Sequence, residues 1–174
     1  GGVGSRFWTM STADKPKQFI DVLGVGRSLM QLTYDRLKGI TKPENVWVVT
    51  NAKYCELVHE QLPDIPIDNI LSEPCRRNTA QCIAYVSWRI KKSDPKANII
   101  VTPSDHIVTN QEEFRRVINN CLKFTSETDA IVTLGMTHSR AETGYGYIQA
   151  DLTTPSARNK EIFRVDQLKE KPDA

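Results

Sequence analysis

The sequence predicts an α/β fold in which helices flank a mostly parallel sheet, and three observations support this. Short apolar runs rich in β-branched residues alternate along the chain with segments of helical periodicity. The runs are apolar throughout instead of alternating with polar residues, which is typical of strands buried on both faces of a sheet. The repeated order of strand, helix and strand favours right-handed βαβ crossovers with parallel neighbouring strands.

The length and composition narrow the classes of protein to consider. The 174 residues suffice for about one domain, and 39% hydrophobic and 25% charged residues are an ordinary globular balance. The longest apolar run covers only residues 82–86, whereas a membrane-spanning helix needs about 20 residues. The net charge of +2 is too small to indicate a nucleic-acid partner. The four cysteines form no CxxC pair and no Cys/His cluster, which favours reduced thiols in a cytosolic protein. We therefore expect a cytoplasmic protein without membrane or nucleic-acid partners; homo-oligomerisation stays open.

The first half of the chain predicts two strands and three helices. Gly24 and Gly26 indicate a tight turn before a helix that begins at Ser28. A second helix follows the first strand from Asn51, and a third begins at about Asn78. The two strands are expected at residues 46–50 and 69–71.

The second half continues the alternation and then changes character. Residues 111–124 carry apolar side chains at helical spacing, and Thr109 or Asn110 can cap this helix. Further strands are expected at 98–102 and 130–134, and antiparallel or edge strands at 145–148 and 162–165. In a parallel sheet ligands bind at the carboxyl ends of strands, so the segments after the strands are the candidate sites.

The opening segment combines glycines with a permanent positive charge. Gly1, Gly2 and Gly4 would let backbone amides approach an anion closely, and the guanidinium of Arg6 fits phosphate oxygens. Lys17 adds a second cation after a proline. Together they would make a triphosphate cradle, although neither the P-loop pattern nor the dinucleotide fingerprint is present. The alternative is a glycine turn beside surface bases.

Two carboxylates follow predicted strands. Glu73 could accept two hydrogen bonds from the adjacent N1–H and N2–H₂ donors of guanine, a pair that the other bases do not offer on one edge. A surface carboxylate paired with Arg76 or Arg77 is the alternative. Asp105 is placed to hold Mg²⁺ against phosphates, since this ion needs only one or two protein carboxylates. Otherwise Asp105 would cap a turn.

The C-terminal third contains two segments suited to a sugar phosphate. Around Gly146, glycine beside tyrosine would bring backbone amides close to a ligand between ring walls, although a glycine-broken edge strand would look the same. Glu170 could accept hydrogen bonds from sugar hydroxyls and Lys171 could meet a phosphate; a charged chain end is the alternative.

Taken in order, these motifs resemble the sugar-nucleotide pyrophosphorylases, and within them the mannose-1-phosphate guanylyltransferases. The resemblance extends from Gly1 to Pro172. It implies a Rossmann-like mixed sheet, one nucleotidyltransferase domain over residues 1–174 that we expect to be incomplete at both ends, and formation of GDP-mannose from GTP and mannose 1-phosphate with Mg²⁺. The motifs that carry it are GGVGSRFW, KPKQF, EPCRRNTA, PSDH, ETGYGYI and EKP.

The resemblance also implies a role for each motif residue. Arg6, Lys17 and Asp105 would be catalytic, with Asp105 the metal ligand. Gly146, Glu170 and Lys171 would bind the sugar phosphate. The residues expected to bind the nucleotide are Gly1, Gly2, Gly4, Ser5, Arg6, Lys17, Glu73, Asn78 and Thr79.

The sequence departs from the family and leaves alternatives. Thr9 and Gln81 stand where relatives usually have proline, which affects loop stiffness rather than charge. A second metal-binding aspartate is expected in a later part of the catalytic domain, so this chain alone is not expected to turn over efficiently. A nucleotidyltransferase for another sugar or base, such as a molybdenum-cofactor guanylyltransferase, and a non-catalytic regulatory module that binds nucleotide sugars remain alternatives.

Overall fold

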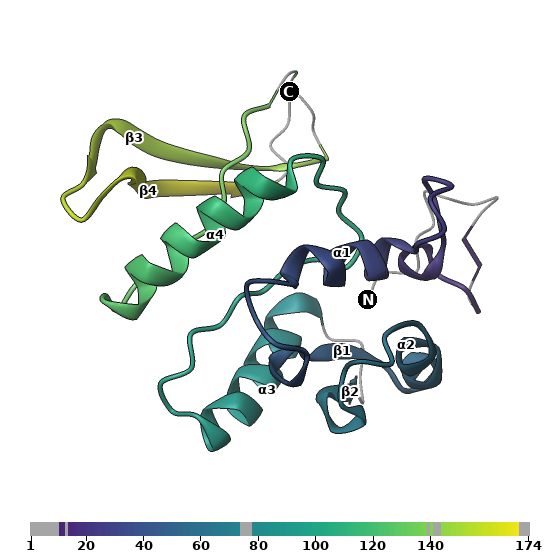
Figure 1. The fold of residues 1–174 in the computed structure, drawn as a ribbon. Helices are drawn as coiled ribbons and strands as arrows, with labels where there is room; N and C mark the ends of the chain where they lie inside the picture. Colours follow the sequence, from purple (N-terminus) through teal and green to yellow (C-terminus); the bar gives the residue numbers. More distant parts are fainter. Residues whose placement is uncertain (1–10, 13, 74–77, 139, 141–143, 171–174) are drawn as a thin grey trace. The chain divides into compact units, whose positions relative to one another are not determined.

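The computed structural model describes residues 11–12, 14–73, 78–138, 140 and 144–170 (Figure 1). The chain divides into two compact units, residues 1–116 and 117–174, which are described separately. Helix α4 (Gln111–Ser126) contains the division between them. The described residues mix helices with parallel and antiparallel strands, as the predicted α/β class requires.

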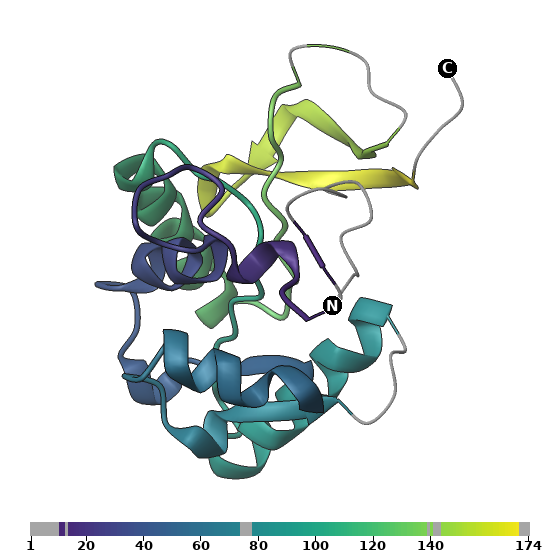
Figure 2. The same cartoon turned by 90° about the vertical axis from the view of Figure 1, so that its right-hand side faces the viewer.

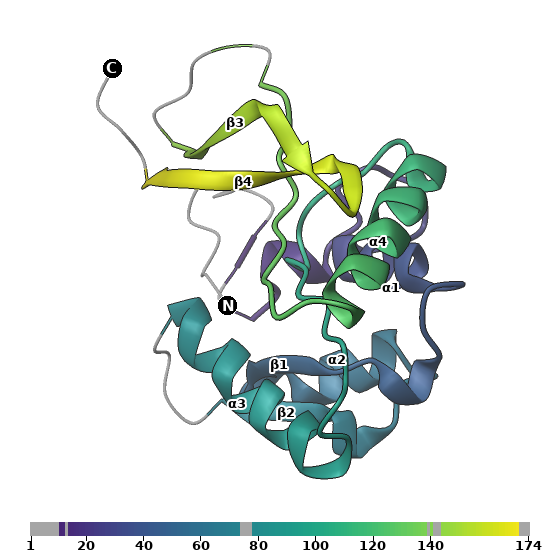
Figure 3. The same ribbon diagram turned by 90° about the vertical axis from the view of Figure 1, so that its left-hand side faces the viewer.

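The first unit contains a parallel pair of strands between helices. β1 (Val48–Asn51) pairs with β2 (Ile70–Glu73) in parallel, with Asn51 opposite Glu73, so the carboxyl ends of both strands lie at the same edge. Figure 1 shows α2 (Cys55–Gln61) and α3 (Asn78–Ser93) on opposite sides of these strands, and Figures 2 and 3 show the same arrangement from the two sides. This is the predicted βαβ unit.

The remaining elements of the first unit are one helix and several single turns. The helix α1 (Leu29–Leu37) follows a turn at which Gly24 and Gly26 have φ of +68° and +75°, which confirms the turn predicted from these glycines. The 3-10 turns are η2 (Lys17–Phe19), η3 (Pro43–Asn45), η4 (Ala52–Tyr54) and η5 (Ile67–Asn69).

A cluster of buried apolar side chains holds α1, α2 and β1 together. Val58 and Ile65 at its centre are 0% and 1% exposed, so a lost methyl group there would leave a cavity. The cluster combines side chains of the helices with residues that enter or leave the strands, as expected where helices cover a sheet. Its buried members are Phe19, Met30, Tyr34, Val46, Tyr54, Val58, Leu62 and Ile65.

The second unit is built on a long antiparallel hairpin. β3 (Gly146–Ser156) pairs with β4 (Asn159–Glu170), and the register shifts three times along the pair. These strands are where the predicted antiparallel strands 145–148 and 162–165 lie, but they are longer. Figure 3 shows the two strands running side by side over most of their length.

The predicted helix 111–124 is confirmed as α4, and its cap is Asn110. Asn110 Oδ1 accepts a hydrogen bond from the Glu113 amide at 3.0 Å. Ile118 in its apolar stripe is 7% exposed. None of the described helices is both long and apolar enough to cross a bilayer.

The strands predicted at 98–102 and 130–134 are wrong for the part of the chain that the structure describes. Neither segment is in a ladder, and Val101 and Ile131 are 54% and 102% exposed. β-branched residues favour extended backbone, but a strand forms only where a neighbouring backbone accepts and donates its hydrogen bonds. The described residues provide that pairing in only two sheets, so the parallel part is smaller than predicted.

Replacing Ser28 by alanine is expected to lower the free energy of unfolding of the first unit by about 1 kcal/mol. Ser28 and Gln31 form a reciprocal capping box at the start of α1, and the substitution removes its hydroxyl acceptor. Chemical denaturation followed by circular dichroism measures the change. Ser93→Ala is the control, because that hydroxyl only donates to a carbonyl at the exposed end of α3; equal effects of both substitutions would contradict the role of the cap.

Candidate active site

Two residues predicted to act on phosphates, Lys17 and Asp105, meet in the first unit. Lys17 Nζ lies 2.5 Å from Asp105 Oδ2. The two side chains are 30% and 26% exposed, so the pair is partly desolvated and still reachable by a ligand. The residues lie far apart in the sequence, so tertiary structure, not local geometry, brings the cation and the carboxylate together.

Lys17 is held in place by its neighbours, which enter the core. Pro16 is fully buried and Phe19 is 3% exposed, with its ring centroid 5.5 Å from that of Tyr54. The amides of Phe19 and Ile20 close the single turn η2 by donating to the carbonyls of Pro16 and Lys17. The backbone that carries Lys17 is therefore fixed, while its ammonium group stays at the surface.

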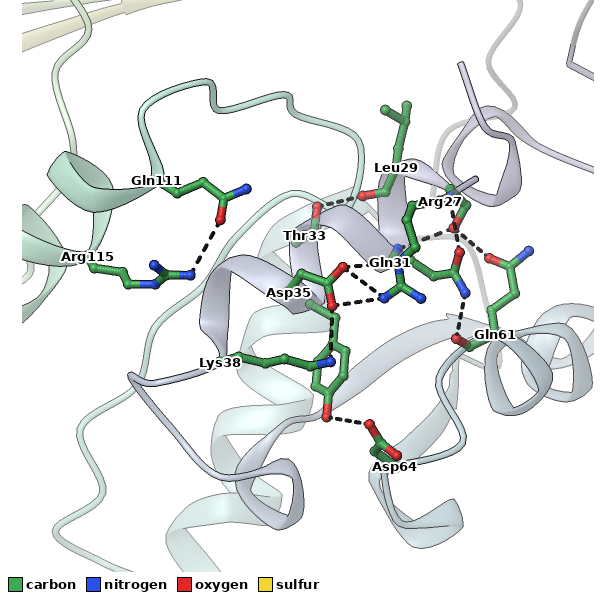
Figure 4. Close-up of polar contacts among 12 residues, drawn as sticks. Arg27, Leu29, Gln31, Thr33, Asp35, Lys38, Gln61, Asp64, Gln111 and Arg115 are labelled. Carbon is green, nitrogen blue, oxygen red and sulfur yellow. Dashed lines mark hydrogen bonds and ion pairs between the residues drawn. The ribbon is translucent and has the colours of Figure 1, made fainter. Parts of the chain in front are cut away.

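Gln61, at the end of α2, joins the Lys17 segment to α1. Its Nε2 donates to the Phe19 carbonyl at 3.1 Å, and its Oε1 accepts from Ser28 Oγ at 2.7 Å. Its backbone carbonyl accepts from Gln31 Nε2 at 3.0 Å (Figure 4). Sequence reasoning missed Gln61, because glutamine at the end of a helix carries no signal for such contacts.

Glu73 ends β2 at the carboxyl edge of the parallel pair, between a strand and a helix as predicted, and it is half-buried. It lies close to the Cys82 thiol in α3. Burial raises the pKa of Cys82, and a hydrogen bond with Glu73 and the charge of that carboxylate raise it further. Cys82 therefore remains a thiol near neutral pH and can donate to Glu73.

The predicted residues Asn78 and Thr79 form the start of α3, in the first turn after β2. Thr79 is exposed. The amides of a helix N-terminus attract anions, so this position is compatible with a nucleotide ligand.

In the second unit, Gly146 and Glu170 are opposite each other in the β3–β4 ladder. A Cβ atom at Gly146 would lie 2.9 Å from Glu170 Oε2, closer than real Cβ contacts allow. A side chain at residue 146 would therefore require the flexible Glu170 carboxylate to shift. The structure brings together two of the three residues predicted to bind a sugar phosphate.

The other predicted site residues lie outside the described part of the chain. They are Gly1, Gly2, Gly4, Ser5, Arg6 and Lys171.

A hollow of about 520 Å³ lies elsewhere on the first unit and contains none of the predicted residues. It is open and carries both signs of charge: Lys53 Nζ is 3.8 Å from the Asp14 carboxylate and 4.7 Å from the centre of the Tyr54 ring. We place the candidate site at Lys17 and Asp105 and not in this hollow, because the sequence selects both of these residues for phosphate or metal chemistry and selects none of the residues that line the hollow.

A parallel βαβ unit with the Glu73 carboxylate at the carboxyl end of a strand is compatible with a nucleotide-binding class of protein, and comparison with known proteins names the family. All of residues 1–174 match the nucleotidyl transferase family. The chain belongs to that family.

The similar curated proteins are more specific. The chain is 33% identical to a mannose-1-phosphate guanylyltransferase of Escherichia coli K12, over 99% of the chain and 36% of the relative. It is 36% identical to mannose-1-phosphate guanylyltransferase 2 of Escherichia coli O157:H7, over 99% of the chain and 37% of the relative. The alginate biosynthesis protein AlgA of Pseudomonas syringae is 35% identical, with 99% and 35% covered. The chain thus spans about a third of the length of these relatives.

A solved structure confirms the fold. The chain matches the crystal structure described as a mannose-1-phosphate geranyltransferase from Thermus thermophilus with a TM-score of 0.84 at 29% identity. The match covers 99% of this chain and 48% of the other. The predicted α/β class, and the resemblance on which it partly rested, are confirmed.

Proposed function

We propose that the protein transfers GMP from GTP to mannose 1-phosphate, which yields GDP-mannose and diphosphate. The observation that carries the proposal is the meeting of Lys17 with Asp105 at 2.5 Å, because the sequence alone selects both residues for phosphate chemistry. The names of the similar proteins support the choice of nucleotide and sugar.

The reaction requires little covalent chemistry from the protein. A phosphate oxygen of the sugar 1-phosphate attacks the α-phosphorus of GTP in line; the bond from that phosphorus to the bridging oxygen breaks, and diphosphate leaves with the electron pair. The attacking oxygen is already anionic near neutral pH, so no strong base is needed. Catalysis then consists of holding two anions together and offsetting their charge.

Lys17 supplies part of that charge. Pro16 and Phe19 anchor the backbone on either side of Lys17. The backbone that carries the cation is therefore already in place before the substrate binds. A compact ammonium with three donors suits phosphate oxygens on the α-phosphate and on the departing diphosphate. We propose that Arg6 adds a second cation to the same phosphates.

Asp105 is the residue that would hold Mg²⁺. Its carboxylate oxygens suit a hard cation, it is half-exposed, and Mg²⁺ that keeps its waters and binds substrate phosphates needs only one or two protein carboxylates. Among the described residues, no group of three or more potential ligands from His, Cys, Asp and Glu occurs. When bound, the ion would neutralise phosphate charge.

We propose that Glu73 selects guanine. Its half-buried carboxylate stands at the carboxyl end of β2 and can accept from both N1–H and N2–H₂ of that base. Asn78 and Thr79, at the start of α3, would border the same nucleotide. The Cys82 thiol beside Glu73 adds a weak donor that helps to fix the carboxylate.

Replacing Glu73 by glutamine is expected to lower the preference for GTP over UTP by about 10-fold or more. A carboxylate accepts two hydrogen bonds, whereas an amide presents a donor to one of the two guanine groups, and each lost charged hydrogen bond costs about 1.5–3 kcal/mol. Competition between the two nucleotides measures the ratio. Glu44→Gln, at an exposed residue whose carboxylate lies 3.9 Å from Lys42, is the control. Unchanged discrimination would remove Glu73 from this role.

The second unit would contribute the sugar-phosphate contacts. We propose that Glu170 accepts from sugar hydroxyls beside Gly146, its partner in the β3–β4 ladder, and that Lys171 meets the phosphate. We further propose that residues 1–174 act as one nucleotidyltransferase domain, with the nucleotide bound by the first unit.

Diphosphate release tests the function as a whole. The complete protein is supplied with Mg²⁺, four nucleoside triphosphates and three sugar 1-phosphates in all combinations. Release with GTP and mannose 1-phosphate above every other pair is expected. A different favoured pair would reassign the base or the sugar, and nucleotide binding without release from any pair would favour the regulatory module.

A further inference from the structure

Arg36, on α1, is a charged residue in the interior. Only 3% of the residue is exposed, and burial lowers the pKa of its guanidinium from the ordinary value. Burying a cation is costly unless polar partners replace the lost water. The partners of Arg36 therefore show why the fold retains a charge at this position.

Two of its nitrogens bind different segments. Nη1 donates to the backbone carbonyl of His106 at 2.7 Å, and Nη2 donates to Thr33 Oγ1 at 3.1 Å. Thr33 Oγ1 in turn donates to the Leu29 carbonyl one turn earlier in α1 at 2.9 Å (Figure 4). The guanidinium carbon also lies 5.7 Å from the centre of the Phe114 ring in α4. Arg36 thus joins α1 to the segment that precedes α4.

The segment that Arg36 holds has little structure of its own. Residues 97–110 form neither a helix nor a strand, so backbone ladders do not fix them. The bond to the His106 carbonyl is a charge-assisted hydrogen bond, which is stronger than a neutral one. The residue immediately before His106 is Asp105, whose carboxylate meets Lys17. A shift of this backbone would move that carboxylate.

We propose that Arg36 is a positioning residue that fixes the Asp105 carboxylate for phosphate and metal binding through the His106 carbonyl. Its consequence for turnover rests on the proposed function. Arg36 touches neither substrate nor metal in this account; it acts through one backbone hydrogen bond. The two members of the Lys17–Asp105 pair are therefore each held from the core, Lys17 through Phe19 and Gln61, and Asp105 through Arg36.

The test compares Arg36→Met, Arg36→Lys and Arg27→Met in the complete protein. Methionine keeps much of the apolar stem and removes every donor, and lysine keeps the charge with one donor group. Arg27 is the matched control, because it also pairs with a partner on α1, the Asp35 carboxylate at 2.8 Å, but forms no hydrogen bond or ion pair with residues 103–110 in the described structure. Two quantities are measured: amide hydrogen exchange of peptides covering residues 103–110, and the Mg²⁺ concentration that gives half-maximal turnover.

We expect Arg36→Met to speed exchange in residues 103–110 and to raise the half-saturating Mg²⁺ concentration, each by about 10-fold, as for other residues that orient a metal ligand. Arg36→Lys should fall between it and the unsubstituted protein, and Arg27→Met should change neither quantity. If Arg36→Met loses protection from amide exchange throughout the first unit, the same two measurements on Arg36→Lys decide whether the proposal holds. Exchange and half-saturation as in the Arg27 control would overturn the proposal.

Asp105→Asn separates this inference from the function on which it rests. Unchanged turnover in Asp105→Asn would mean that Asp105 has no part in the reaction, whereas the absence of diphosphate release from GTP and mannose 1-phosphate with the unsubstituted protein would mean that the proposed function is wrong. The exchange of residues 103–110 in Arg36→Met would still decide whether the arginine fixes this segment, because that readout does not depend on catalysis.

Discussion

Replacing Lys17 by alanine is expected to slow turnover of the complete protein about 100-fold or more. In the proposed reaction the ammonium group would offset negative charge that builds on the phosphates as the bond to diphosphate breaks, and removing one such donor costs about 3–4 kcal/mol of barrier. The loss should appear mainly in kcat, since the contact strengthens in the transition state. Diphosphate release at saturating GTP and sugar phosphate measures it.

Two further variants sharpen this expectation. Lys17→Arg keeps the charge but changes its shape, so it should retain part of the activity. Lys53→Met removes a lysine from the same unit that is paired with Asp14, and it should leave turnover unchanged. Turnover of Lys17→Ala at the level of the Lys53 variant would show that Lys17 is only a surface partner for Asp105.

Replacing Asp105 by asparagine is expected to have an effect of the same size, about 100-fold or more on turnover. The amide keeps the shape of the side chain but loses the negative charge that would attract Mg²⁺. The Mg²⁺ concentration for half-maximal turnover should therefore rise as well, and a titration with Mg²⁺ measures it. A lower rate with an unchanged Mg²⁺ requirement would contradict the role of Asp105 as metal ligand.

The Lys17 and Asp105 substitutions should not be additive. The two side chains contact each other, so removing one leaves its partner unpaired at a half-buried position. The double variant Lys17→Ala/Asp105→Asn should lose less than the product of the two single effects. Independent effects would indicate that the pair does not act as a unit.

The sequence is sufficient for those parts of the fold whose determinants are local. α4 is predictable because its apolar residues recur at helical spacing and Asn110 precedes it. Both features depend only on residues that are close together in the sequence. Gly24 and Gly26 similarly mark a turn that requires positive φ. The strands predicted at 98–102 and 130–134 are wrong because a strand forms only by pairing with a second segment. The residue types of one segment do not show whether such a partner is present.

The candidate site likewise combines residues that the sequence predicts with contacts that it does not predict. Lys17, Glu73 and Asp105 can be selected from residue type and position: Lys17 follows a proline, Glu73 ends a strand that forms, and Asp105 follows a predicted strand that does not form. The contact between Lys17 and Asp105 cannot be predicted from the sequence, because it depends on how α1, α2 and residues 97–110 pack. Gln61 and Arg36 escape sequence reasoning because each donates to the backbone carbonyl of a distant residue, Phe19 or His106, and such a contact leaves no pattern in the sequence.

The crystal structure of the complete protein with GDP-mannose tests the central claim most directly. We expect the diphosphate of the bound product to lie against the Lys17 ammonium, with Asp105 beside the same phosphates. A diphosphate bound away from both residues, for example in the hollow between Asp14 and Lys53, would contradict it.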